Sequence, residues 1–147
     1  MIPNKPPADF TDPESPLGRL ESIGYRCCGE WQLSGDRVRC TLIANAQAAN
    51  VLYAFVCEKT VMYVGKTTQS LRARMSGYAN PGPTQSTNIK GNEKIRELLL
   101  AGKTVEVYAL PDNGLLKYGG FHVNLAAGLE DSIVRDLNPP WNRLGTM

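Results

Sequence analysis

Side chains that could do chemistry are concentrated in one stretch, residues 51–78. Tyr53 and Tyr63 carry hydroxyls that can accept a proton once nearby positive charge lowers their pKa from about 10. Lys66 and Arg74 supply positive charge, and the planar donor fork of an arginine suits the oxygens of an anion. These groups can act on an anionic substrate only if the fold brings them onto one surface.

Two β-prone runs hold the two tyrosines. They are Val51–Cys57 and Val61–Val64, and only the polar residues 58–60 separate them. Runs of this kind predict a β-hairpin. If Cys57 faces Val61, the alternation of side chains places five residues on one face of the hairpin. These residues are Val51, Tyr53, Phe55, Val61 and Tyr63.

A helix is predicted after Gly65, with Thr67 or Thr68 as its cap. Four residues at helical spacing form one stripe along it. They are Leu71, Arg74, Met75 and Tyr78. Arg74 therefore points inward, whereas Arg72 lies about 100° round the helix from Leu71. An inward arginine needs a partner, because an unpaired buried charge is costly.

Two tyrosine-containing triplets followed by an inward arginine resemble the motif of the GIY-YIG nuclease family. Val51-Leu52-Tyr53 stands for the first triplet and Tyr63-Val64-Gly65 for the second. The resemblance continues to the C-terminus. Valine replaces the usual first glycine, and the loop before the helix is one residue longer than in common members. This extra residue leaves Arg72 and Arg74 as alternatives for the family's arginine, and the helical stripe favours Arg74.

A C-terminal helix is predicted over Leu125–Leu137, with Asn124 as its cap. Its apolar arc comprises Leu125, Ala126, Leu129, Ile133, Val134 and Leu137. Glu130 falls inside this arc, where carboxylates are rarely unpaired, so it is either half of a salt bridge, for example with Arg74, or a metal ligand. The resemblance favours the metal ligand, because the nuclease motif has a glutamate here. Asn142 matches the closing asparagine of the motif and is expected to tether the site by hydrogen bonds.

The resemblance implies a phosphodiester-hydrolysing site. Its implied catalytic residues are Tyr53, Tyr63, Lys66, Arg74, Tyr78, Glu130 and Asn142. Glu130 would hold one Mg²⁺ or Mn²⁺, since one carboxylate suffices when water and phosphate complete the shell. Arg74 would brace the scissile phosphate. This arrangement requires the Glu130 carboxyl to lie on the same side of the sheet as Tyr53, Tyr63 and Arg74.

Either Tyr53 or Tyr63 is expected to be the general base. Positive charge from Lys66, Arg74 and the metal would lower the pKa of that tyrosine. Tyr78, one turn after Arg74, is expected to orient water or phosphate.

Two polar regions are candidates for contact with DNA. Residues 79–91 are rich in Pro, Gly, Ser, Thr and Asn and are predicted to form a long loop. Its candidate DNA-binding residues are Gln85, Ser86, Thr87, Asn88 and Lys90. Arg37 and Arg39 share one face of the second strand in a hairpin predicted over residues 29–43. For both regions the alternative is a solvated surface without contact to DNA.

The chain is predicted to form one domain preceded by an arm. Residues 1–16 hold five of the ten prolines and are expected to be a flexible arm, with a partner-wrapping arm as the alternative. Residues 17–147 are predicted to form a single GIY-YIG-like nuclease domain. Within it, residues 17–50 are an N-terminal extension and residues 51–147 are the catalytic core.

The remaining elements define the predicted fold class. Ser15 caps a short helix that starts at Pro16 and ends before Gly24. A helix over residues 92–101 precedes a third strand over residues 104–110. The expected class is α/β, of the α+β type. It has a small three-stranded, mainly antiparallel sheet flanked by helices, with an N-terminal helix and hairpin as the extension.

Composition limits the class of protein. The chain of 147 residues is 42% hydrophobic and 20% charged, as in ordinary soluble domains. A net charge of +2 and a pI near 8.4 do not by themselves indicate a nucleic-acid binder. No apolar run spans a bilayer, and the N-terminus lacks a secretion-signal pattern. Four cysteines without a C-x-x-C pair favour reduced thiols in a cytoplasmic protein over a zinc site.

The sequence therefore predicts a divalent-metal-dependent DNA endonuclease, most similar to the small restriction-endonuclease members of the family. Its expected partner is double-stranded DNA. A homodimer is expected because one site per chain cuts one strand. The alternatives are a repair or structure-specific nuclease that acts with a partner, and a non-catalytic DNA-binding module that retains the fold.

Overall fold

A five-stranded antiparallel sheet forms the centre of the molecule. The computed structural model describes residues 10–112, 114 and 116–143, and the strand order is β2-β1-β5-β3-β4. The strands are β1 Arg26–Ser34, β2 Arg37–Leu42, β3 Val51–Cys57, β4 Thr60–Thr67 and β5 Val105–Pro111. The helices are α1 Pro16–Ser22, α2 Leu71–Ala79, α3 Ser86–Leu100 and α4 Leu125–Leu137, with the short 3-10 helix η1 Pro140–Asn142.

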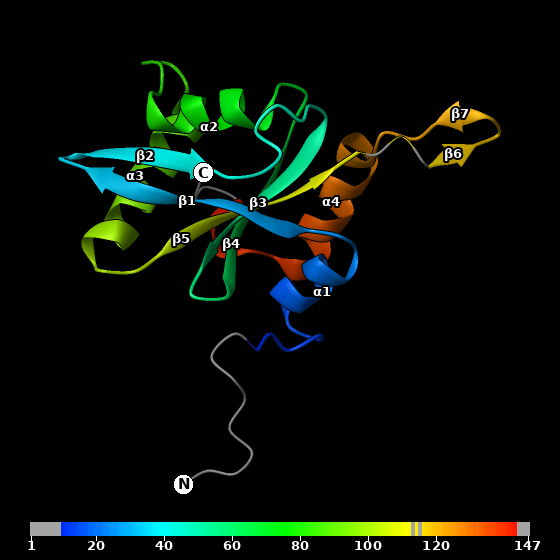
Figure 1. Cartoon of the computed structure of the whole chain (residues 1–147), viewed down its shortest axis with the longest axis horizontal. Coiled ribbons are helices and arrows are strands. Elements are labelled where there is room, and N and C mark those ends of the chain that lie inside the picture. Colours follow the sequence, from blue (N-terminus) through cyan, green and yellow to red (C-terminus); the bar gives the residue numbers. More distant parts are fainter. Residues whose placement is uncertain (1–9, 113, 115, 144–147) are drawn as a thin grey trace, which may run out of the picture.

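Helices cover both faces of the sheet. The side chains of α2 and α3 pack on one face, and those of α1 and α4 pack on the other. Figure 1 shows these four helices around the sheet. This arrangement confirms the predicted α+β class. The three predicted strands are the adjacent β4, β3 and β5, and the N-terminal hairpin extends the same sheet because β1 pairs with β5.

β3 is buried along its whole length, since it has a strand on each side and helices on each face. Its alternate residues Val51, Tyr53 and Phe55 belong to the core under α2 and α3. The residues between them, Leu52, Ala54 and Val56, belong to the core under α1 and α4. The period-two pattern thus assigns each β3 side chain to one of two cores.

The β3–β4 hairpin has a different register from the predicted one. Cys57 pairs with Thr60 rather than facing Val61, so the turn has two residues, Glu58 and Lys59, with φ of 48° and 66°. Such positive φ values are those of the tight turns that suit the twist of paired strands.

A bulge then restores the expected position of the second tyrosine. Val61 pairs with Val56, and Tyr63 pairs with Phe55, so Met62 is the extra residue. Val61 therefore packs under α1 and α4, and its predicted position on the tyrosine face is wrong. Tyr63 does share the face of Phe55, as predicted.

The starts of α1 and α4 agree with the sequence prediction, and the starts of α2 and α3 differ from it. Ser15 caps α1 and Asn124 caps α4, as predicted. Ser70 caps α2, where its hydroxyl accepts from the Ala73 N–H at 3.1 Å. The predicted caps Thr67 and Thr68 are wrong, because β4 continues through the first of them. α2 begins at residue 71, which is the first residue of the predicted inward-facing stripe.

α3 is longer than predicted, because residues 86–91 are helical rather than part of a loop. Its N-terminal half is polar, but Asn88, Gly91 and Ile95 are buried against the rest of the protein. Tertiary packing therefore forms a helix that local propensity does not favour. The remaining connection between α2 and α3 is short, over residues 80–85.

Two further features lie outside the central layers. Strands β6 Lys117–Tyr118 and β7 Phe121–His122 form a small hairpin that projects from the body (Figure 1). Most of the predicted arm, residues 1–9, lies outside the described residues. None of the helices that the structure describes is long and apolar enough to cross a membrane.

Candidate active site

Arg74 is the centre of a polar cluster between α2 and the sheet. Its Nε donates to the Tyr53 hydroxyl at 3.1 Å, and its Nη2 donates to the Tyr78 hydroxyl at 2.9 Å. The two hydroxyl oxygens lie 2.7 Å apart. Nη1 donates to Asn88 Oδ1 at 2.7 Å. As the helical stripe predicted, Arg74 faces inward, whereas Arg72 is exposed.

All three partners of the Arg74 side chain are neutral. The ion pairs within the described residues involve other cations, and Glu130 forms neither a hydrogen bond nor an ion pair with Arg74 there. A guanidinium has five N–H donors, so the three bonds leave two of them for another acceptor. A half-buried cation with neutral partners and spare donors suits an incoming anion, in particular phosphate.

Burial raises the pKa of Tyr53 and of Tyr78. Tyr53 is 1% exposed, and the cost of burying its phenolate is larger than the lowering due to Arg74. For Tyr78, burial and the neighbouring Tyr53 both raise the pKa. Arg74 lowers the pKa of Tyr53 as expected, but burial outweighs this effect, so the expected net lowering of that pKa is wrong. Tyr63 is only half-buried, with its ring stacked on Phe55 at 5.8 Å between centroids.

Gly65 makes room for the Tyr53 ring. The two residues are paired across β3 and β4 and lie on the same face. A Cβ at residue 65 would lie 2.6 Å from Cζ and from Oη of Tyr53, and 2.8 Å from Cε2 of Tyr63. The closing glycine of the second triplet is thus required by the close approach of the two tyrosine rings, because any side chain would occupy their space.

A cleft of about 400 Å³ opens where β4 ends. Its lining residues are Lys66, Thr67, Thr68, Gln69, Arg74, Asn124, Ala126 and Ala127. Lys66 pairs with Leu52 and therefore faces the α4 side, opposite to Gly65 and Tyr63. Arg74 comes from the other layer, so the two faces of the sheet meet at this cleft.

Glu130 lies on α4, which covers the face of the sheet opposite to Tyr53 and Tyr63. The requirement that its carboxyl share their face is therefore not met, because the packing of α4 against Leu52 and Ala54 decides its layer. The nearby carboxylate adds to the effect of burial in raising the pKa of Tyr25. α4 reaches the cleft one turn before Glu130.

The side chains near the cleft fit a metal site with a single carboxylate ligand. Within the described residues, no three or more His, Cys, Asp or Glu side chains gather where they could hold a metal ion. Glu130 is half-buried and is the carboxylate one turn from the cleft. A single carboxylate fits Mg²⁺, which keeps most of its waters and takes oxygens from a substrate phosphate.

Asn142 completes the outer edge of β4. Its Oδ1 accepts from the Val64 N–H at 2.8 Å, and its Nδ2 donates to the Val64 carbonyl at 2.8 Å. β4 is an edge strand, so this side chain replaces a neighbouring strand at one position. The pair holds η1 against the strand that carries Tyr63 and Gly65.

The candidate DNA-binding residues fall into separate groups. Gln85 and Asn88 are bonded to each other, and Asn88 is also bonded to Arg74. Ser86 and Lys90 are exposed on α3, where Thr87 is half-buried. Arg37 and Arg39 lie on β2, at the opposite edge of the sheet from β4. They face away from α2 and α3, because the alternate residues Val38 and Cys40 pack on that side.

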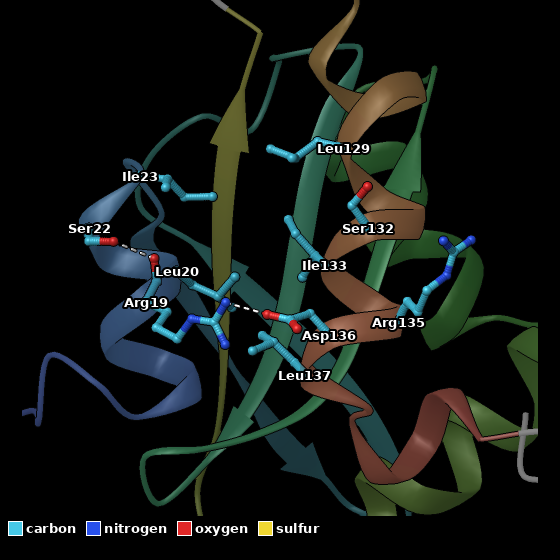
Figure 2. Close-up of a pocket in the computed structure, with 10 residues that line it drawn as sticks. All are labelled: Arg19, Leu20, Ser22, Ile23, Leu129, Ser132, Ile133, Arg135, Asp136 and Leu137. Atoms are coloured by element: carbon cyan, nitrogen blue, oxygen red, sulfur yellow. Dashed lines mark hydrogen bonds and ion pairs between the residues drawn. The ribbon is translucent and has the colours of Figure 1, made fainter.

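A larger cavity, of about 530 Å³, lies between α1 and α4 and has none of the candidate residues in its lining. Figure 2 shows Leu129, Ile133 and Leu137 pointing from α4 into the space beside α1, with an ion pair between Arg19 and Asp136. Half of its ten lining residues are aliphatic, and the other half are the polar or charged Arg19, Ser22, Ser132, Arg135 and Asp136. The cavity offers no constellation for the chemistry expected of the tyrosines and Arg74.

Comparisons with known proteins agree with this architecture. No family model matches the sequence, and no curated protein matches it. EndoII of bacteriophage T4, solved in a mutant form, shares 23% identity and a TM-score of 0.66 over 84% of this chain and 95% of that one. Restriction endonuclease HPY188I in complex with product DNA shares 14% identity and a TM-score of 0.54 over 93% of this chain and 94% of that one. This chain therefore has a fold seen in nucleases.

Proposed function

We propose that this chain is a DNA endonuclease of the GIY-YIG type that hydrolyses phosphodiester bonds with one divalent cation, Mg²⁺ or Mn²⁺. The observation that carries the proposal is the Arg74 guanidinium, which lines a cleft with Lys66 and has neutral partners among the described residues. Two similar structures, one of them bound to product DNA, are those of endonucleases and support the proposal.

The side chains of the cleft have distinct proposed roles. Arg74 binds the scissile phosphate through its spare donors and stabilises the charge that builds up there. Lys66 adds positive charge from the other side of the cleft. Tyr53 and Tyr78 hold the guanidinium in place through their hydroxyls.

Tyr63 is the better candidate for the general base. The hydroxyl of Tyr53 is buried, its pKa is raised, and it is already bonded to Tyr78 and Arg74. Tyr63 is partly exposed and lies on the same face, and we therefore assign to it the deprotonation of the attacking water.

Glu130 lies on the other face of the sheet from Tyr53, but the two faces meet at the cleft, which α4 lines one turn before Glu130. Glu130 is therefore the proposed ligand of a divalent cation at the cleft, where water and phosphate oxygens would complete the shell. When bound, the cation supplies Lewis-acid stabilisation of the phosphate and of the leaving 3′-oxygen. Asn142 has a supporting role, because its two bonds to Val64 fix the edge of the strand that carries Tyr63.

The test is plasmid nicking by the full chain in buffer with Mg²⁺ or Mn²⁺. Arg74→Ala and Glu130→Gln are expected to lower the nicking rate by about 100-fold or more, as when a group that stabilises transition-state charge is removed. Arg72→Ala is the matched control, since it removes an exposed arginine from the same helix and should leave the rate unchanged. Nicking that persists in both Arg74→Ala and Glu130→Gln would overturn the assigned site.

We further propose a type II restriction-like role, carried out by a homodimer, because one site per chain cuts one strand. Discrete fragments from linear duplex DNA support this role, and sedimentation of the free protein tests the dimer. Cleavage confined to branched or damaged DNA would instead identify a repair or structure-specific nuclease. Binding of DNA without nicking under either metal would identify a non-catalytic module.

A further inference from the structure

Asn88 is a buried amide that bridges Arg74 and the loop between α2 and α3. It is 8% exposed, on the first turn of α3. Its Oδ1 accepts from Arg74 Nη1 at 2.7 Å, and its Nδ2 donates to Gln85 Oε1 at 3.0 Å. The Arg74 guanidinium can bond only to the amide oxygen, and the Gln85 carbonyl oxygen can bond only to the amide nitrogen. These two partners therefore determine the orientation of the Asn88 amide.

Gln85 connects this amide to the loop backbone. Its Oε1 also accepts from the Gly82 N–H at 2.9 Å. A continuous chain of hydrogen bonds therefore runs from Gly82 through Gln85 and Asn88 to the guanidinium of Arg74. Gln85 itself is exposed, so the chain begins at the molecular surface.

We propose that Asn88 is a positioning residue for Arg74, and that Gln85 makes the position of Arg74 depend on the conformation of the loop at residues 80–85. The proposal rests on the proposed function in one respect, which is that Arg74 binds a phosphate of DNA. DNA that presses on the loop displaces Gln85, and the displacement passes through Asn88 to the guanidinium. Asn88 then acts through Arg74, although the sequence suggested a contact with DNA.

The neutral character of the amide matters for this role. A carboxylate at residue 88 would form an ion pair with Arg74 and compete with the incoming phosphate. The amide oxygen holds Nη1 without cancelling its charge. Tyr53 and Tyr78 hold the other nitrogens in the same way, so every observed partner fixes the fork and leaves its charge available.

Steady-state nicking of a short duplex by the full chain separates positioning from DNA contact. Asn88→Ala is expected to lower kcat by about 10- to 100-fold while KM and the Kd for DNA change by less than about two-fold, because a misplaced group costs rate more than affinity. Asn88→Asp is expected to raise the Kd for DNA as well. Ser76→Ala, an exposed change on the helix that carries Arg74 and outside this loop, is the control and should match the wild type. A raised KM with unchanged kcat in Asn88→Ala would show a DNA contact and overturn the proposal.

A second measurement does not depend on nuclease activity. The Nε–H resonance of Arg74, assigned from its loss in Arg74→Lys, is followed by NMR in the full chain without DNA or metal. Hydrogen exchange at this group is expected to be about 10-fold faster or more in Asn88→Ala, and faster to a smaller extent in Gln85→Ala, since each loosens the guanidinium. The circular dichroism of each variant verifies that it is folded.

The two measurements separate failure of this inference from failure of the proposed function. An unchanged Arg74 Nε–H resonance in a folded Asn88→Ala variant overturns the positioning role whether or not the chain cuts DNA. A resonance that responds as expected, in a protein that never nicks DNA, supports the positioning role and removes only the proposed function.

Discussion

A methyl group added at residue 65 is expected to destabilise the protein by displacing Tyr53. The new Cβ would lie 2.6 Å from Cζ and Oη, whereas ordinary contacts begin at 3.4 Å, so ring or strand must shift by about 0.8 Å (3.4 − 2.6). The ring is buried, and its hydroxyl is bonded to Tyr78 at 2.7 Å and to Arg74 at 3.1 Å. Overpacking costs about 1–3 kcal/mol, and weakening one such bond costs about 1 kcal/mol more.

Gly65→Ala is therefore expected to lower the free energy of unfolding by about 2–4 kcal/mol, and Tm by about 5–15 °C for a chain of this size. Urea unfolding followed by tryptophan fluorescence measures the first, and calorimetry the second. Gly128→Ala on α4 is the control, because nothing lies within 4 Å of its new Cβ. That variant should gain up to about 1 kcal/mol of stability from helix propensity. A Gly65→Ala protein as stable as the wild type would show that Tyr53 is not held where the structure places it.

Three further outcomes are expected. Tyr25→Phe should raise the free energy of unfolding by about 1 kcal/mol in urea titrations, because it removes a buried hydroxyl with no hydrogen-bond partner among the described residues; a destabilised variant would contradict this. Asn142→Ala should cost about 1–3 kcal/mol and speed hydrogen exchange at the Val64 amide, since both bonds to that residue are lost; unchanged exchange would refute it. Because burial raises the pKa of Tyr53 and Tyr78, their contribution to stability is complete below about pH 10 and declines as the pH rises through that value. As the pH rises above about 10, the urea midpoint should therefore decrease, and it should decrease less in Tyr53→Phe than in the wild type. An equal decrease in the two proteins would contradict this.

Local spacing was sufficient to predict the parts of the site that one element or one hairpin decides. The stripe at i, i+3, i+4 and i+7 placed Arg74 on the inner face of α2, where it contacts Tyr78 one turn later. Alternation placed Tyr53 on one face of β3. The cap and both ends of α4 also follow from residues next to them in sequence.

Long-range packing decided what the sequence did not predict. Met62 is an extra residue in β4, and nothing in its type distinguishes a bulge from a regular strand position. Asn88 looks like a loop residue until Arg74 and Gln85 provide its partners. The layer occupied by Glu130 depends on where α4 crosses the sheet, which the periodicity of a helix does not reveal. The inward position of Arg74 predicted that its side chain has a partner, but it did not predict which residue that partner is.

The pairing of β1 with β5 has a consequence for how much of the chain can be expressed alone. β5 lies between β1 and β3, so removal of the N-terminal hairpin would leave a row of unsatisfied amide and carbonyl groups along one side of β5. Open edges of this kind recruit other strands and promote self-association. A fragment restricted to residues 51–147 is therefore expected to aggregate, even though it contains every residue proposed for the chemistry.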